Sequence, residues 1–157
     1  MPETQITQEQ IQTIVEALFD GATLAQTTGV SQETLEQLYA LGHGFYTSGN
    51  FENALTVFQA LSLYDNRDYR FWLGLGATRQ ALEQYQSAVD AYQMAAIASS
   101  LGNPTPYLHM ADCLIKLGNK PDAVTALEAA AGTAENDASY ADVHARAKAL
   151  LALLTQK

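Results

Sequence analysis

Three residues with reactive or metal-binding side chains fall close together in one stretch of the chain. His109, Asp112 and Cys113 are spaced at i, i+3 and i+4, which places them on one face of a helix. An imidazole, a carboxylate and a thiol in this pattern raise two kinds of chemistry, a metal site and an activated thiol. Three ligands on one short face make poor zinc geometry, and Cys113 is the only cysteine. We therefore predict a buried, unreactive Cys113, with no metal and no cofactor.

Other catalytic patterns are equally weak. Gly74-Leu75-Gly76 lies within a helical pattern and lacks the third glycine of a phosphate-binding loop, so helix packing explains Gly76 better. His43 and His144 have no neighbouring nucleophile or acid in the sequence. His43 has two open interpretations, contact with a partner group or a place in the wall of a groove. No paired carboxylates stand out, and we predict that the protein is not an enzyme.

Composition indicates a single folded domain outside the membrane. The chain has 157 residues, of which 48% are apolar and 16% are charged, so disorder is disfavoured. No apolar run approaches the roughly 20 residues that span a bilayer. Residues 1–10 contain no Lys or Arg and precede no continuous apolar run, so we expect no secretory signal and a cytosolic location.

The charge is acidic and unevenly distributed. The net charge is -9, and residues 1–66 contain eight carboxylates and no Lys or Arg. Such a field repels phosphate backbones and anionic membranes, so we expect neither direct nucleic-acid binding nor membrane binding. Two interpretations of the acidity remain open, which are simple solubility and attraction of a partner with basic segments.

A repeat of about 34 residues organises the chain. Its first copy places large, small and aromatic residues at fixed positions: Leu38, Leu41, Gly42, Phe45, Gly49, Phe51, Ala54 and Phe58. The second copy has Trp72, Leu75, Gly76, Arg79, Glu83, Tyr85, Ala88 and Tyr92 at those positions. The third has Tyr107, Met110, Ala111, Leu114, Gly118, Lys120, Ala123 and Leu127. This pattern resembles the tetratricopeptide repeat, whose small residues mark close helix crossings. Arg79 and Glu83 depart from it.

The sequence therefore predicts an all-α fold with three tandem tetratricopeptide-type helical hairpins in a curved solenoid. We expect one domain over residues 1–157, with repeats at 35–68, 69–102 and 104–137. An N-terminal helix and linker occupy residues 1–30, and a C-terminal capping helix occupies residues 138–157, because the ends of a solenoid need covering. Thr7 and Gln10 form a candidate capping box, and residues 21–31 are expected to be a linker or irregular segment.

An apolar stripe runs along the N-terminal helix and consists of Ile11, Ile14, Val15, Leu18 and Phe19. We favour packing of this stripe on the array as a cap, because most amphipathic stripes contribute to the core. The alternative is a contact with a second copy or another partner.

The first helix of each repeat should line a concave groove. Groove positions recur along these helices, and Phe51 should lie at the edge. The candidate binding residues are Tyr39, His43, Tyr46, Phe51, Arg70, Leu73, Ala77, Gln80, Leu108, Asp112 and Ile115. An apolar strip with a polar rim is typical of a binding surface, so we expect the groove to hold apolar anchors of an extended segment. Arg70 and Lys116 are the only candidate cations for binding a terminal carboxylate.

Several stretches resemble one family closely. They are GATL at 21–24, TLEQLY at 34–39, VFQAL at 57–61, Tyr64-Asp65 and RFWLGLGATRQ at 70–80. These sequences are similar to those of the class II chaperones of bacterial type III secretion, of the LcrH/SycD type, and the similarity covers roughly residues 17 to 127. The resemblance implies a bacterial cytosolic chaperone that binds hydrophobic translocator proteins through an extended N-terminal segment and keeps them soluble for export.

The resemblance also implies particular residue roles. Tyr39, Tyr46 and Phe51 match groove aromatics of the family, Leu73 and Ala77 fall on matching groove positions, and His43 stands where relatives carry an aromatic. Some members form homodimers and some assist a transcription activator, and both options stay open. The alternative function is a general tetratricopeptide adaptor or scaffold that binds other regulatory or structural proteins.

Overall fold

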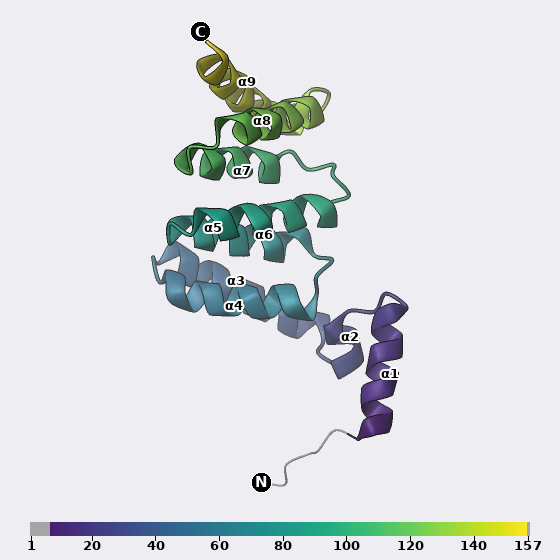
Figure 1. Ribbon diagram of the computed structural model, residues 1–157. Helices are drawn as coiled ribbons and strands as arrows, with labels where there is room; N and C mark the ends of the chain where they lie inside the picture. Colours follow the sequence, from purple (N-terminus) through teal and green to yellow (C-terminus); the bar gives the residue numbers. More distant parts are fainter. Residues whose placement is uncertain (1–6, 157) are drawn as a thin grey trace.

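The computed structural model describes residues 7–156, and every regular element in that range is a helix. In chain order the elements are α1 (Gln8–Phe19), α2 (Leu24–Thr28), α3 (Gln32–Thr47), α4 (Phe51–Tyr64), α5 (Tyr69–Ala81), α6 (Tyr85–Ala98), α7 (Thr105–Lys116), α8 (Lys120–Ala134), the 3-10 helix η1 (Ala138–Tyr140) and α9 (Ala141–Thr155). Figure 1 shows helices α3 to α9 stacked along one direction, with α1 standing apart at the N-terminal end. The predicted all-α class is confirmed.

Three helical hairpins form the array: α3 with α4, α5 with α6, and α7 with α8. Local capping defines where their first helices begin. The Ser31 side chain accepts a hydrogen bond from the Thr34 amide, so α3 starts at Gln32, ahead of the expected start at residue 35. Asp68 caps α5 in the same way through the Arg70 amide.

The turn inside each hairpin has the same backbone conformation. Gly49 and Gly118 have φ angles of 78° and 74°, as expected for glycine at a helix end. Glu83 occupies the equivalent turn of the second hairpin with φ 59°, a left-handed conformation that costs free energy for a residue with a Cβ. Its amide still donates to the Gln80 carbonyl over 3.0 Å, as the Gly49 amide does to the Tyr46 carbonyl. The fold therefore imposes this turn even where glycine is missing.

The core lies between successive hairpins, as the repeat pattern predicts. Ala54, Ala88 and Ala123 are each fully buried, which lets the two helices of a hairpin approach closely. The large residues that follow four positions later, Phe58 and Tyr92 among them, are also buried and fill the space toward the next hairpin. Close-packed interiors tolerate little change in volume at such crossings.

Two glycines of α5 are essential to this packing. A Cβ on Gly76 would lie 2.6 Å from Cε1 of Tyr92, inside the same hairpin. A Cβ on Gly74 would overlap the ring of Phe58, which belongs to the preceding hairpin. The sequence analysis explained Gly76 by packing but assigned nothing to Gly74. Both glycines allow an aromatic ring to rest directly on the α5 backbone.

The C-terminal helix closes the array as expected. Helix α9 packs along α8, and Ala147 is fully buried at their contact. Val143, Leu150, Leu151 and Leu154 are half-buried against the same core. This apolar face therefore covers the last hairpin.

The N-terminal region differs from the expectation in two ways. Thr7 and Gln10 form the predicted capping box, but α1 packs against α2 and not against the hairpins, and none of its residues is buried. Phe19 is 88% exposed. The favoured packing of the stripe on the array is therefore wrong. The expected linker contains a short helix, α2, because Thr23 and Gln26 form a second capping box.

Within residues 7–156, none of the helices combines the length and the apolar character that a membrane span requires.

Candidate binding groove

The first helices of the hairpins, together with α9, form one row of neighbouring elements. Helix α3 contacts α5, α5 contacts α7, and α7 contacts α9. We call the surface of this row the first-helix face. An open cavity of about 390 Å³ lies on it. Helices α3, α5, α7 and α9 line the cavity together with α6, the second helix of the middle hairpin. The lining residues are Tyr46, Ala77, Gln80, Ala81, Tyr92, His109, Asp112 and Arg146. Four of the eleven candidate residues thus meet in one cavity.

Aromatic contacts shape the N-terminal side of this cavity. The ring of Tyr46 meets the ring of Phe51 edge to face, with centroids 5.5 Å apart and planes at 61°. Both side chains are half-buried, and they come from the two helices of the first hairpin. Ala77 lies opposite on α5, and its small side chain leaves space in front of the Tyr46 ring. This part of the cavity is apolar and suits an aliphatic anchor.

A hydrogen bond organises the centre of the cavity. The Tyr92 hydroxyl donates to Oε1 of Gln80 over 2.7 Å, which joins α6 to α5. Burial raises the pKa of Tyr92 well above its usual value, because the ring is enclosed and its phenolate would lack solvent. The hydroxyl is therefore a fixed donor, and Gln80 points its amide NH₂ away from this bond.

The C-terminal wall is polar. Arg146 of α9 donates to Oδ2 of Asp112 on α7 over 2.8 Å. His109 stacks on Tyr92 with ring centroids 5.3 Å apart and an interplanar angle of 23°. Burial lowers the pKa of His109, and the nearby Asp112 carboxylate partly opposes this shift. The neutral imidazole is thus favoured at neutral pH.

A second group of candidate residues lies beyond the cavity, at the N-terminal end of the first-helix face. Tyr39 is half-buried, with its ring 6.1 Å from that of Phe58 and 5.8 Å from that of Phe71. His43 is exposed one helical turn further along α3. The structure therefore places His43 at the surface of this face and gives it no aromatic neighbour among the described contacts.

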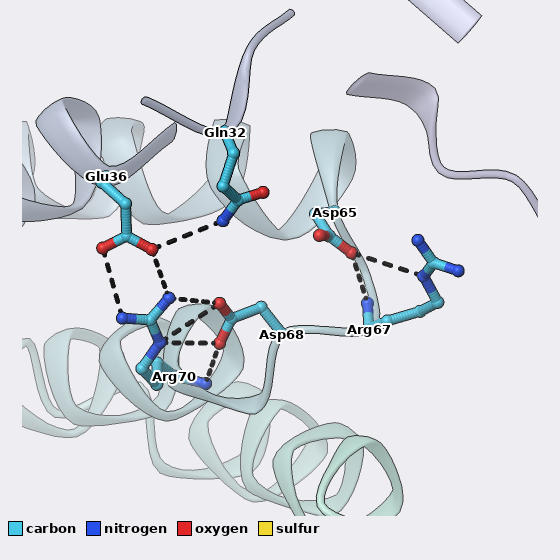
Figure 2. Close-up of polar contacts among 6 residues, drawn as sticks. All are labelled: Gln32, Glu36, Asp65, Arg67, Asp68 and Arg70. Atoms are coloured by element: carbon cyan, nitrogen blue, oxygen red, sulfur yellow. Dashed lines mark hydrogen bonds and ion pairs between the residues drawn. The ribbon is translucent and has the colours of Figure 1, made fainter. Parts of the chain in front are cut away.

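Arg70 holds the centre of an ionic cluster at this end. Its guanidinium donates to Oε2 of Glu36 on α3 over 3.3 Å and to Oδ2 of Asp68 over 2.6 Å. Figure 2 shows the planar fork between the two carboxylates. The hydrogen bond from Arg70 lowers the pKa of Glu36, and the two carboxylates raise that of Arg70. This cation is therefore already paired, and Lys116, the other candidate cation, is exposed near the end of α7.

Three apolar candidates lie deeper than the sequence analysis assumed. Leu73 and Ile115 are half-buried and pack against the C-terminal part of the core. Leu108 is only 4% exposed, so it belongs to the core and cannot offer its side chain to a partner. Its placement in an exposed strip is wrong, because its side chain packs within the C-terminal part of the core.

The cysteine behaves as a buried apolar residue. Cys113 is fully buried, and burial raises its pKa to about 11. A thiol with that pKa is protonated at neutral pH and is a poor nucleophile. Asp112 is engaged by Arg146, and the described part of the chain contains no cluster of three His, Cys, Asp or Glu side chains suited to a metal.

Tyr92, His109, Arg146 and Ala81 line the cavity without having been predicted. Tyr92 stands in the sequence analysis only as a repeat position, but it also lines the cavity, and its hydroxyl is bonded to Gln80 there. His109 had been considered only as a metal ligand. Arg146 lies 34 residues after Asp112, the same separation as Glu36 and Arg70, and this repeated spacing of opposite charges is the signal that could have revealed it.

Comparison with known proteins agrees with this architecture. The family model described as tetratricopeptide repeat matches residues 35–66, and a second model with the same description matches residues 80–154. The low calcium response locus protein H of Yersinia pestis is 37% identical over 155 residues, which cover 99% of this chain and 92% of the relative. The expected tetratricopeptide hairpins are thus confirmed.

Two solved structures are similar over most of the chain. The Yersinia enterocolitica type III secretion translocator chaperone SycD matches with a TM-score of 0.79 and 38% identity, over 85% of this chain and 98% of SycD. PcrH of Pseudomonas aeruginosa, solved in complex with the chaperone binding region of PopD, matches with a TM-score of 0.78 and 38% identity, over 81% of this chain and 95% of PcrH. The chain belongs to the LcrH/SycD family of type III secretion translocator chaperones.

Proposed function

We propose that this protein is a cytoplasmic bacterial chaperone of type III secretion. It binds hydrophobic translocator proteins through an extended segment on the first-helix face, and it keeps them soluble and competent for export. The observation that carries the proposal is the cavity of about 390 Å³ on this face, in a chain whose relative PcrH is solved with the chaperone binding region of a second protein.

The chemistry of the cavity suits an apolar anchor of an extended chain. Tyr46 and Ala77 supply an apolar wall, and the Tyr92 ring forms the floor. Tyrosine offers a large contact area at low cost in conformational entropy. The polar groups at the C-terminal wall, Asp112 and Arg146, satisfy each other, so an apolar side chain can enter without leaving an unpaired buried charge.

The charges of this face disfavour recognition of a terminal carboxylate. Arg70 is shared between Glu36 and Asp68, and Arg146 is paired with Asp112. A client carboxylate would have to displace one of these partners. Selection therefore rests on apolar anchors within the segment and not on its end.

Moderate affinity fits the role of a secretion chaperone. An unfolded client loses conformational entropy when its segment becomes ordered, so part of the contact energy is offset. Release before export then requires no chemical step, and the buried thiol and the paired carboxylates need no catalytic role. We accordingly assign the protein no enzymatic activity.

The apolar stripe of α1 provides a second contact surface. Ile11 is 51% exposed and Val15 is 42% exposed, on a helix that packs mainly against α2. We assign this stripe to a client or to a second copy of the chain, which was the alternative interpretation of the sequence.

The experiment that tests the proposal is co-expression with translocators of the same bacterium, followed by affinity capture and mass spectrometry. Ala77→Glu places a charge in the cavity and is expected to abolish capture. Ala40→Glu introduces the same charge at an exposed position of α3 outside the cavity and should retain capture. Capture of folded soluble proteins alone would favour a general adaptor. Equal capture by both variants would show that the groove does not bind the client.

A further inference from the structure

The ionic cluster at the N-terminal end of the first-helix face contacts an aromatic side chain as well as carboxylates. The guanidinium carbon of Arg70 lies 5.0 Å from the centroid of the Tyr39 ring and 5.7 Å from that of the Phe71 ring. A planar guanidinium attracts the negative face of an aromatic ring at such distances. Arg70 therefore covers one side of Tyr39, while Phe58 and Phe71 contact the ring from the core.

The two carboxylates determine where the guanidinium can lie. Glu36 comes from α3, one helical turn before Tyr39, and Asp68 is the residue that caps α5. Nε of Arg70 donates to Oδ1 of Asp68 over 3.0 Å, while Nη1 donates to Glu36 over 3.3 Å. Figure 2 shows that the carboxylates approach different edges of the fork. Opposed contacts of this kind fix both the position and the plane of the guanidinium.

The ion pairs of this cluster contribute too little to folding stability to explain its arrangement. The side chains of Arg70 and Glu36 remain 35% and 45% exposed, and ion pairs with such exposure contribute little to folding. The cluster has a clearer effect on side-chain position, because it joins α3 to α5 beside the ring of Tyr39.

We propose that Arg70 is a positioning residue for the groove: held between Glu36 and Asp68, it fixes the ring of Tyr39 on the first-helix face and so shapes the subsite for the client beyond the cavity. The inference deepens the proposed function and rests on it. Arg70 does not bind the client directly, and its charge is occupied by the two carboxylates.

The test uses the full chain and two readouts. The first is the dissociation constant for a fluorescein-labelled peptide of the PopD chaperone binding region, measured by fluorescence anisotropy. The second is the NMR spectrum of ring-¹³C-tyrosine in the unliganded protein, with the Tyr39 signal assigned through Tyr39→Phe. The ring signal reports on Tyr39 whether or not the peptide binds.

Arg70→Met is expected to weaken peptide binding by about tenfold, because the Tyr39 ring would no longer be held in one orientation on the first-helix face. The Tyr39 ring signal should shift and broaden. Arg70→Lys should not restore either readout, because an ammonium group cannot bridge both carboxylates and stack on the ring. In a Tyr39→Leu background, Arg70→Met should have no further effect on affinity, since its action passes through that ring.

The matched control is Arg67→Met, which removes the same charge from the loop that immediately precedes α5. Arg67 pairs with Asp65 and contacts Gln26 of α2, and it touches no ring of the binding face. Its peptide affinity should equal that of the unmodified protein, with a thermal midpoint similar to that of Arg70→Met.

Three results would overturn the inference: an unchanged Tyr39 signal in Arg70→Met, peptide binding by that variant that is unchanged or tighter, or full rescue by Arg70→Lys. If the unmodified protein fails to bind both the PopD peptide and its own translocators, the proposed function fails. The Tyr39 signal then still decides whether Arg70 positions the ring.

Discussion

Arg146 of α9 and Asp112 of α7 form a hydrogen-bonded ion pair of 2.8 Å across the end of the cavity. The pair joins the C-terminal helix to the third hairpin on the binding face, while the apolar residues of α9 attach it to α8 on the opposite side. Helix α9 therefore both covers the end of the core and completes the wall of the groove.

The Asp112–Arg146 pair should contribute modestly to stability. Asp112→Asn, Arg146→Met and the double variant form a thermodynamic cycle measured by urea unfolding. Because Arg146 is 54% exposed, solvent screens the pair, and we expect a coupling energy of about 0.5 kcal/mol. If the changes in unfolding free energy of the two single variants add up to that of the double variant, the pair makes no contribution to stability.

Gly76→Ala should destabilise the second hairpin. The new Cβ would lie 2.6 Å from the Tyr92 ring, which is buried and held by Gln80 and cannot move aside. We expect a loss of about 1–3 kcal/mol in the free energy of unfolding, typical of overpacking. Gly44→Ala is the control, because its Cβ would have open space in α3. It should stabilise the protein by about 0.5–1 kcal/mol through helix propensity. Urea unfolding should therefore show stability changes of opposite sign for the two variants, and changes of the same sign would contradict the hairpin geometry.

Glu83→Gly should stabilise the protein. Glu83 has φ 59°, and glycine adopts this conformation without a steric penalty. The relief is partly offset by the greater freedom of glycine in the unfolded chain, so we expect a gain of about 0.5–1 kcal/mol. Glu83→Ala removes the same charge but keeps a Cβ, and it should give no such gain. Calorimetric midpoints of the two variants separate backbone relief from charge removal.

Stability should fall in mild acid because of His109. Burial holds the pKa of His109 below its usual value of 6.5. At a pH between the folded and unfolded pKa values, the unfolded chain therefore binds a proton that the folded chain does not. This contribution is fully present above that value and is lost as the pH falls through the lower folded pKa. Unfolding free energies measured between about pH 7.5 and about pH 5.5 should decline less in His109→Gln than in the unmodified protein.

Equal slopes in His109→Gln and in the unmodified protein would mean that His109 is not the titrating group responsible.

The repeat, the hairpins and the turn positions could be predicted from the sequence. They follow from local properties that spacing reveals: small residues at Gly42 and Gly76 where helices cross, and glycine at Gly49 where φ is positive. The helical phase also identified Tyr46, Ala77 and Asp112 as neighbours on one face, and the cavity brings these three together. Periodicity is sufficient here because each hairpin contacts only its neighbours.

Other features depend on how the hairpins are packed in three dimensions. Helical phase assigns Leu108 to the groove, but in the folded chain its side chain is buried in the core. Amphipathicity predicts that α1 needs a partner, but it does not say which one, and α1 stands away from the array (Figure 1).

The sequence alone determined the class of fold, the small residues at its crossings and the helix face that carries the candidate groove, because these depend on contacts between residues close in the chain. Only the tertiary structure decided that Arg70 pairs with two carboxylates beside Tyr39 and that Arg146 closes the cavity. Both arrangements join residues that are 34 positions apart. The spacing makes such pairs possible, but whether they form depends on how the packed core places the neighbouring helices.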